Sequence, residues 1–157
     1  MKSQDVYTKF WEAFDELLIE NGEPFNLTHF YSGRETSWAC VNSNRARRSN
    51  SLEASITGNC SKLRVDLYIE NKEVNKFLYN KLLSNYDLIR QEAQASLEWE
   101  NGTKSKKTIR LAYYVPINRY NVDTYRDTIE RVLPVYVKLI KTLKKLGVYL
   151  SLIHISE

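Results

Sequence analysis

The sequence predicts a two-layer α+β domain, in which helices pack on one face of an antiparallel sheet of about five to six strands. Within residues 63–70, apolar side chains alternate with polar ones, as in a strand with one buried face. Amphipathic helical patterns stand near both ends of the chain and in its middle. Short turns separate the predicted strands, which favours antiparallel pairing. The polar side of the central strand, with Arg64, Asp66 and Tyr68, is expected to be accessible.

The first predicted helix occupies the N-terminal part of the chain. Its apolar residues recur at helical spacing from Val6 to Leu18. Ser3 is a suitable N-cap, and Gly22 followed by Pro24 is a typical helix end. Four strands are predicted next, at residues 25–31, 38–41, 52–57 and 62–70. Residues 42–51 are polar and lack periodicity, so they are predicted to form an exposed loop.

A helical pattern over residues 74–95 follows, with a break expected near Ser84-Asn85. A hairpin is predicted from residues 97–100 to 108–115, turning through Asn101-Gly102. The predicted element order, including the final helix, is α-β-β-β-β-α-β-β-α.

The final helix is predicted over residues 122–146, with Asn121 as its cap and Gly147 at its end. Pro134 lacks an amide hydrogen and is predicted to kink or divide this helix. Residues 1–149 therefore form one predicted α+β domain. Residues 150–157 resemble one reading frame of a transposase adapter used to prepare DNA sequencing libraries. We therefore expect them to be a non-native tail and exclude them from fold and site.

The composition predicts a soluble protein of the cytoplasm. Hydrophobic residues make up 43% and charged residues 27% of the 157 positions. No apolar run approaches the roughly 20 residues of a membrane helix, and no secretory signal is present, so we expect no membrane contact. Cys40 and Cys60 are expected to be buried free thiols.

Several chemistries are not supported by the sequence. Cys40, Cys60 and His29 are too few and too scattered for a structural zinc site, so no metal is expected. No serine-hydrolase motif and no glycine-rich phosphate loop is present. We accordingly expect no cofactor.

The strongest binding signal is basic. The formal net charge is +4, and a surplus of this kind permits contact with a polyanion. The guanidinium group of arginine can form two parallel hydrogen bonds with phosphate oxygens. If the loop with Arg45, Arg47 and Arg48 and the hairpin tip with Lys104, Lys106 and Lys107 lie at the same sheet edge, they would form an anion-binding rim. The alternative is a pair of solvated loops. The candidate anion-binding residues are Arg34, Arg45, Arg47, Arg48, Lys62, Arg64, Tyr68, Lys104, Lys106, Lys107 and Arg110.

A magnesium-dependent nuclease is a second hypothesis. Asp66, Glu70 and Lys72 are the residue types that hold Mg²⁺ and a phosphate in such enzymes. Lys72 lies where the strand is expected to end, and a three-residue pattern of this kind is common by chance, so we favour a solvated strand end over a nuclease site. Similarly, Glu98 and Glu100 are expected to pair across strands with Arg110 or Arg64.

Several segments, in their order along the chain, resemble one bacterial and archaeal family, the domain of unknown function 4268. The segments are Phe10-Trp-Glu-Ala13, Leu63-Arg-Val-Asp-Leu-Tyr-Ile69, Asn75-Lys76, Leu97-Glu-Trp-Glu100 and Ile109-Arg-Leu111. The resemblance covers residues 6–149 and implies no catalytic residues. Members of the family occur alone or behind restriction-type nuclease domains, which implies a role in DNA restriction or defence. Because Met1 directly precedes the first helix, we expect no upstream nuclease.

The leading hypothesis is a non-catalytic prokaryotic module that binds DNA or RNA, or a nuclease or defence protein. Mg²⁺ enters only under the nuclease alternative. A third hypothesis is a protein-interaction or dimerisation domain that uses a sheet edge or the last helix.

Overall fold

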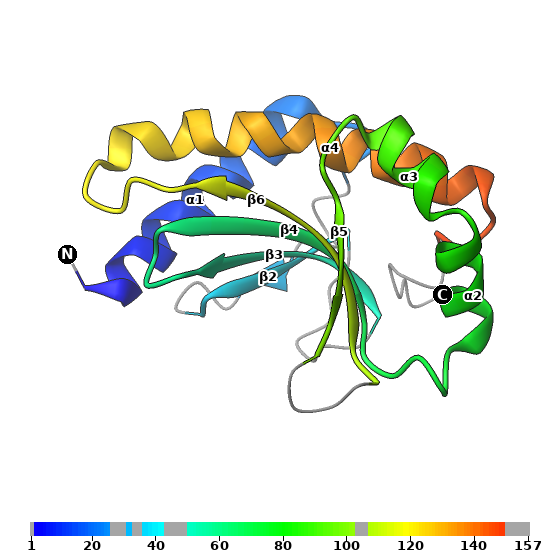
Figure 1. Cartoon of the computed structure of the whole chain (residues 1–157). Coiled ribbons are helices and arrows are strands. Elements are labelled where there is room, and N and C mark those ends of the chain that lie inside the picture. The colour runs from blue at the N-terminus through cyan, green and yellow to red at the C-terminus, as the bar shows by residue number, and fades with distance from the viewer. Residues whose placement is uncertain (1, 26–30, 33–35, 43–49, 103–106, 150–157) are drawn as a thin grey trace.

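The protein is a single antiparallel sheet with all its helices on one side, as the computed structural model shows (Figure 1). The structure describes residues 2–25, 31–32, 36–42, 50–102 and 107–149. This arrangement confirms the predicted two-layer α+β class. It follows from the alternation along the central strands, which gives the sheet one apolar face, and from the amphipathic helices, which cover that face.

Six strands form the sheet in the spatial order β1-β2-β3-β4-β6-β5, and every neighbouring pair is antiparallel. They are β1 (Tyr31–Ser32), β2 (Trp38–Val41), β3 (Ser51–Thr57), β4 (Lys62–Ile69), β5 (Glu98–Asn101) and β6 (Ile109–Pro116). The helices are α1 (Ser3–Asn21), α2 (Lys76–Ser84), α3 (Tyr86–Ala93), the 3-10 helix η2 (Val122–Thr124) and α4 (Tyr125–Lys145).

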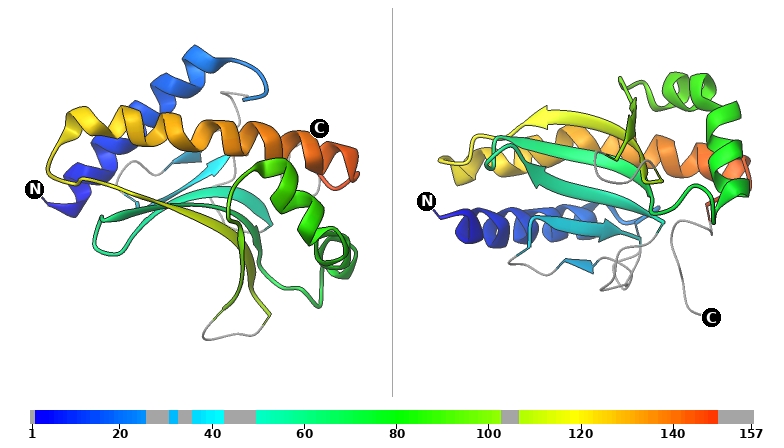
Figure 2. Two further views of the ribbon diagram at one scale, coloured as in Figure 1. Left: turned by 45° about the horizontal axis from the view of Figure 1, so that its top comes forward. Right: turned by 60° about the horizontal axis from the view of Figure 1, so that its bottom comes forward.

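The core lies between the sheet and the two long helices, α1 and α4. These helices contact each other, and α3 contacts α4 further along its length (Figure 2). Val65 and Leu67 of the central strand are buried on this side, at 0% and 1% exposure, as the alternation predicts. The largest buried side chains on the helices include Trp11, Tyr125 and Tyr136. Burial of such aromatic residues is a major contribution to stability.

Most element boundaries agree with the predictions, and the differences are local. The predicted 74–95 helix is interrupted at Asn85, which separates α2 from α3. Pro134 lies inside α4 without dividing it, because the helix remains packed on both sides of the proline. Ser3 is the first helical residue rather than the cap, which is Lys2. Asn101 ends β5 instead of forming the turn.

Some predicted segments fall partly outside the described residues. This applies to 26–30 of the first predicted strand, 43–49 of the polar loop and the 150–157 tail. Cys40 and Cys60 are buried free thiols, as predicted. Within the described ranges, no helix has the length and apolar character required to cross a bilayer.

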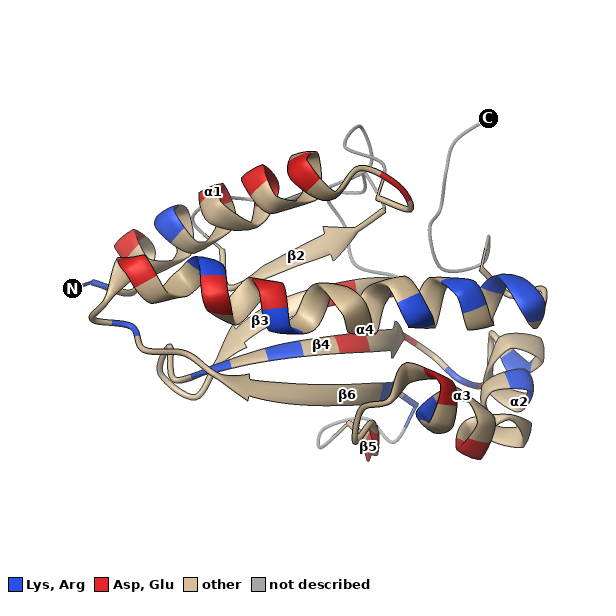
Figure 3. Cartoon of the chain, turned by 90° about the horizontal axis from the view of Figure 1, so that it is seen from above, with Lys and Arg blue, Asp and Glu red and all other residues tan. Residues whose placement is uncertain are grey.

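Charge is unevenly distributed over the helical layer (Figure 3). Helix α1 carries five acidic residues and one lysine. The C-terminal half of α4 carries four lysines and no acidic residue. Helix α1 and the C-terminal half of α4 therefore present opposite charge to solvent.

Candidate functional site

Strand register builds a polar surface on the sheet face opposite the helices. Three rows of side chains cross the central strands on this face. Ser55, Arg64 and Tyr114 form one row, and Glu53, Asp66 and Ala112 form the next. The third row consists of Ser51, Tyr68, Arg110 and Glu100. Side chains in adjacent rows lie close enough to interact, because alternate residues of each strand point to this face.

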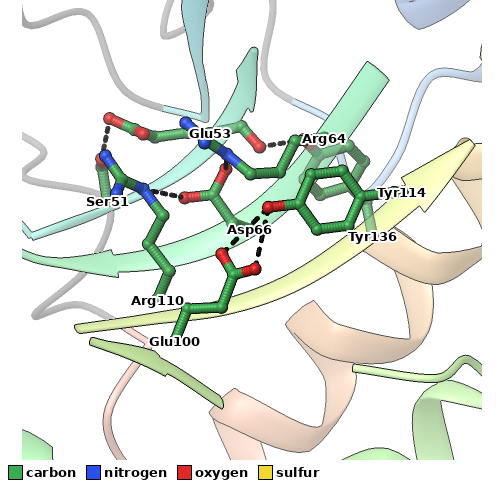
Figure 4. Close-up of polar contacts among 8 residues, drawn as sticks. All are labelled: Ser51, Glu53, Arg64, Asp66, Glu100, Arg110, Tyr114 and Tyr136. Atoms are coloured by element: carbon green, nitrogen blue, oxygen red, sulfur yellow. Dashed lines mark hydrogen bonds and ion pairs between the residues drawn. The ribbon is translucent and has the colours of Figure 1, made fainter. Parts of the chain in front are cut away.

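These rows contain a group of interacting polar residues, here called the buried charge cluster (Figure 4). Its members are Ser51, Glu53, Arg64, Asp66, Glu100, Arg110, Tyr114 and Tyr136. Most come from β3, β4 and β6, so their proximity depends on β6 lying beside β4.

Asp66 lies between two arginines. Its Oδ1 is 3.4 Å from Nε of Arg64, and its Oδ2 is 3.5 Å from Nε of Arg110. The Asp66 side chain is fully buried, whereas the two arginine side chains are 14% and 20% exposed. A buried carboxylate is stable only when it is paired, and here it faces two positive groups.

Burial lowers the pKa of Arg64, but the nearby Asp66, Tyr114 and Glu53 raise it by more, so the net pKa lies above its ordinary value. Arg64 therefore remains charged at every physiological pH.

Glu53 is the second fully buried carboxylate of the cluster, at 0% exposure, directly opposite Asp66 on the neighbouring strand. Its Oε2 accepts a hydrogen bond from the Ser51 hydroxyl at 3.4 Å. From the helical side, the Tyr136 hydroxyl donates to the Glu53 backbone carbonyl. Burial, together with Asp66 and Glu53, raises the pKa of Tyr136 well above its ordinary value. The cluster therefore extends through the sheet to α4.

Glu100 and Tyr114 close the cluster at the β5 side. The Tyr114 hydroxyl donates to both Glu100 carboxylate oxygens, at 3.0 and 2.9 Å. Burial and this bond to Glu100 raise the pKa of Tyr114. The register does place Glu100 opposite Arg110, as the expected cross-strand pair requires. The carboxylate nevertheless bonds to Tyr114.

The expectation that Arg64, Asp66 and Tyr68 would be accessible is therefore wrong for two of the three. Asp66 is 0% and Tyr68 9% exposed. The guanidinium of Arg110 lies over the Tyr68 ring, 4.8 Å from its centroid, and both arginines close over Asp66. Ionic pairing thus folds the long side chains across the sheet face instead of leaving them in solvent.

The predicted anion-binding residues are only partly brought together. Lys62 lies at one end of β4, where its Nζ is 6.0 Å from the centroid of the Tyr114 ring. Lys107 lies at the other end of the sheet and pairs with Glu73 at 3.5 Å. Arg64 and Arg110 belong to the buried charge cluster. The remaining candidates, which lie outside the described residues, are Arg34, Arg45, Arg47, Arg48, Lys104 and Lys106.

The described residues that flank the two basic segments do meet at one end of the sheet. Glu70 donates its amide to Oδ1 of Asn50, at 3.2 Å, next to the 43–49 segment. Lys72 donates its amide to the carbonyl of Lys107, at 2.8 Å, next to the 103–106 segment. We call this the basic end of the sheet, defined by Asn50, Glu70, Lys72 and Lys107.

The candidate nuclease residues are not gathered into one site. Glu70 lies one residue beyond the end of β4 and four residues from Asp66, which separates the two by about 13 Å along the extended chain. Asp66 faces arginines, and the Nζ of Lys72 lies 5.6 Å from the centroid of the Tyr79 ring. Among the residues that the structure describes, no three His, Cys, Asp or Glu side chains gather to hold a metal ion.

Sequence reasoning missed Glu53 and Tyr136 as members of the cluster. Glu53 alternates with Leu52 and Ala54, so its side was predictable, but its partner on the next strand requires the register. Tyr136 was assigned to the core stripe of the last helix, where it does lie. Nothing in the local sequence indicates its bond to a strand carbonyl.

The comparisons with known proteins give a family but no activity. Neither the curated proteins nor the solved structures include a match to the chain. The family model described as domain of unknown function (DUF4268) matches residues 6–146, which include every strand and nearly all of the helical layer. The chain belongs to the DUF4268 family.

Proposed function

We propose that this protein is a non-catalytic module that binds the phosphate backbone of nucleic acid at the basic end of the sheet. The observation that supports the proposal is the position of the described residues that flank the two basic segments of the sequence. These flanking residues are joined at this end by the Glu70–Asn50 and Lys72–Lys107 hydrogen bonds. Arg45, Arg47 and Arg48 belong to one segment, and Lys104 and Lys106 to the other.

Arg110 contributes a guanidinium group next to this end. It lies one residue into β6, beside Tyr68 near the end of β4. Asp66 contacts its Nε and the Tyr68 ring supports its plane, which fixes the orientation of the group. Among the described contacts, its two outer nitrogens make no hydrogen bond. A fixed guanidinium with free outer nitrogens is suited to bidentate contact with a phosphate.

The arrangement favours backbone contact over base reading. Tyr68 is nearly buried and already stacked with Arg110, so it offers no open ring for a base. Positive charge on two segments suits a polyanion of any sequence. We therefore propose duplex DNA as the ligand, with low sequence specificity. The restriction or defence context implied by the family resemblance, and a prokaryotic cytoplasm, are parts of the same proposal.

The test is a fluorescence anisotropy titration of a short labelled duplex. Wild type is compared with the Arg45→Ala/Arg47→Ala/Arg48→Ala variant and with a control of equal net charge, Lys9→Ala/Lys76→Ala/Lys81→Ala. The loop variant should lose at least about tenfold in affinity, and the control should lose much less. If the loop variant and the control lost the same affinity, the loss would be explained by net charge alone, and the proposed site would be contradicted. Absence of binding by wild type at low salt would contradict the function itself.

A further inference from the structure

We infer that a second copy of this chain docks antiparallel on the outward face of α4, across a two-fold axis between Pro134 and Val137. This inference goes beyond the proposed nucleic-acid contact, because it concerns the opposite side of the molecule. It rests on the charge pattern of α4, a hollow beside it and the position of α1.

The solvent-facing stripe of α4 changes character at its centre. Its residues recur at alternating spacings of three and four, which places them along one side of the helix. They are Asp127, Glu130, Pro134, Val137, Lys141 and Lys144. The first two are acidic, the middle two apolar and the last two basic. Figure 3 shows this change of charge along α4.

An antiparallel second copy would match this stripe to itself. When the axis passes midway between Pro134 and Val137, Glu130 faces Lys141 of the second copy, and Asp127 faces Lys144. Pro134 of each copy then faces Val137 of the other copy. Every contact occurs twice, as a two-fold interface requires. Opposite charges at both ends and apolar contact in the middle resemble the pairing of antiparallel helices with complementary flanks.

The centre of this stripe adjoins a hollow that can receive a side chain. The hollow has a volume of about 430 Å³, and its lining includes Leu17, Leu133, Pro134 and Val137. Val137 is 39% exposed, whereas the other valines of α4, Val132 and Val135, are 0% and 6% exposed. In the inferred dimer, Val137 of each copy enters the hollow of the other, which removes both from water.

The charges that would otherwise repel are already compensated within each chain. Arg126 of one copy would face Lys145 of the other, because the two residues are equally far from the axis, and both are positively charged. However, Arg126 pairs with Glu20, and Lys145 pairs with Glu92. Arg126 also contacts Oε1 of Glu130 at 3.5 Å, so in the inferred dimer Glu130 is shared between Arg126 of its own chain and Lys141 of the second copy. Asp127 and Lys141, in contrast, form no ion pair within 4.0 Å of any residue that the structure describes, although Lys141 lies close enough to Glu92 to help lower the pKa of that carboxyl. They remain available for a second copy.

The position of α1 adds a second set of complementary charges. Helix α1 lies on one side of α4 and α3 on the other (Figure 3). The two-fold axis crosses α4 within the interface, so it reverses the direction along α4 but leaves α1 on the same side of that helix. Helix α1 of one copy, which lies beside the N-terminal half of its own α4, is thereby carried alongside the lysine half of α4 in the other copy (Figure 3). Helix α1 has five acidic residues against one lysine, and that half of α4 has four lysines. This complementarity selects a second copy over an uncharged partner.

The experiment is sedimentation velocity over a concentration series that reaches the high micromolar range. Wild type should approach twice the mass of one chain. Lys141→Glu and Glu130→Lys should each weaken the dimer by at least about tenfold, because each creates like-charge pairs. The double variant Glu130→Lys/Lys141→Glu should return to within about threefold of wild type, because it restores the pairs with reversed sign.

Val122, which is about as exposed as Val137 but lies outside α4, provides the control for the test of the hollow. Val137→Asp should abolish the dimer, whereas Val122→Asp, at a valine that is 37% exposed, should leave it unchanged. A wild type that stays monomeric at every concentration would overturn the inference and leave this face to another partner. A dimer that resists Lys141→Glu and Val137→Asp, or a double variant without recovery, would overturn it as well.

Discussion

Oδ2 of Asp66 lies 3.5 Å from Nε of Arg110, on the sheet face opposite the described helices. The carboxylate is fully buried, yet the guanidinium is 20% exposed. This asymmetry gives the pair two roles. Inward, it neutralises a charge within the sheet. Outward, it holds a cationic group in a fixed orientation beside the basic end of the sheet.

The first prediction concerns the inward role. Asp66→Asn should lower the free energy of unfolding by about 3 kcal/mol, because two arginines lose the charge that balances them. Urea denaturation measures this change. The control is Glu73→Gln, which removes an ion pair with Lys107 whose partners are 60% and 53% exposed. Such an exposed pair contributes at most about 1 kcal/mol. Equal effects of the two substitutions would show that Asp66 has no special stabilising role.

The second prediction concerns the outward role. Arg110→Lys keeps the charge but removes the planar fork, so duplex DNA should bind about tenfold more weakly. Arg90→Lys is the matched control, since Arg90 also lies over a tyrosine ring, 5.2 Å from the centroid of Tyr86, but on α3. Anisotropy titrations of both variants give the comparison. If Arg110→Lys bound duplex DNA as tightly as wild type, the guanidinium group of Arg110 would have no part in the proposed phosphate contact.

The third prediction uses the raised pKa of Tyr136. Its hydroxyl stays protonated in the folded protein at a pH where the unfolded chain, with a pKa near 10, already ionises. The stability from this residue is therefore complete below about pH 10 and is lost as pH rises above it. Tyr136→Phe should make the fall in unfolding free energy above pH 10 shallower, by up to about 1.4 kcal/mol per pH unit. Identical slopes would contradict the pKa assignment.

Tyr136→Phe also has a cost at neutral pH. The Glu53 carbonyl loses its buried donor, which should reduce stability by about 1–2 kcal/mol. The same denaturation series at pH 7 measures this difference.

The fourth prediction concerns the turn between β3 and β4. Gly58 has a φ of +59°, and a Cβ there would lie 2.7 Å from Oγ of Ser61. Gly58→Ala should therefore destabilise the protein by more than the roughly 1 kcal/mol expected from the backbone alone. Gly22→Ala isolates the backbone effect, because Gly22 has a φ of +65° with no atom near its Cβ position. If Gly22→Ala costs as much in thermal denaturation, the contact with Ser61 is not responsible.

The fold was predictable because its main signals are local. Alternation in residues 63–70 identifies the face of β4, and helical spacing from Val6 to Leu18 identifies the buried side of α1. The break at Asn85 also follows from the sequence. Pro134 did not divide α4 because tertiary packing of Leu133 and Val135 outweighs a lost backbone hydrogen bond.

The buried charge cluster was only partly predictable. The sequence places Arg64, Asp66 and Arg110 on the polar side of their strands, but not beside one another. Their contact requires β6 to pair with β4, with Asp66 opposite Ala112. Strand order and register depend on long-range packing, which no local pattern in this chain encodes. For the same reason, the burial of Asp66 and Tyr68 could not be anticipated.

The most direct test of the proposed function is the salt dependence of duplex binding by the wild-type protein. Anisotropy titrations across a range of salt concentrations give the slope of log affinity against log salt. The proposal predicts a steep linear decrease, with a slope of about −0.9 for each phosphate contacted, and a shallower slope, by roughly 2 to 3, for the Arg45/Arg47/Arg48 variant. An affinity that does not change with salt would contradict it.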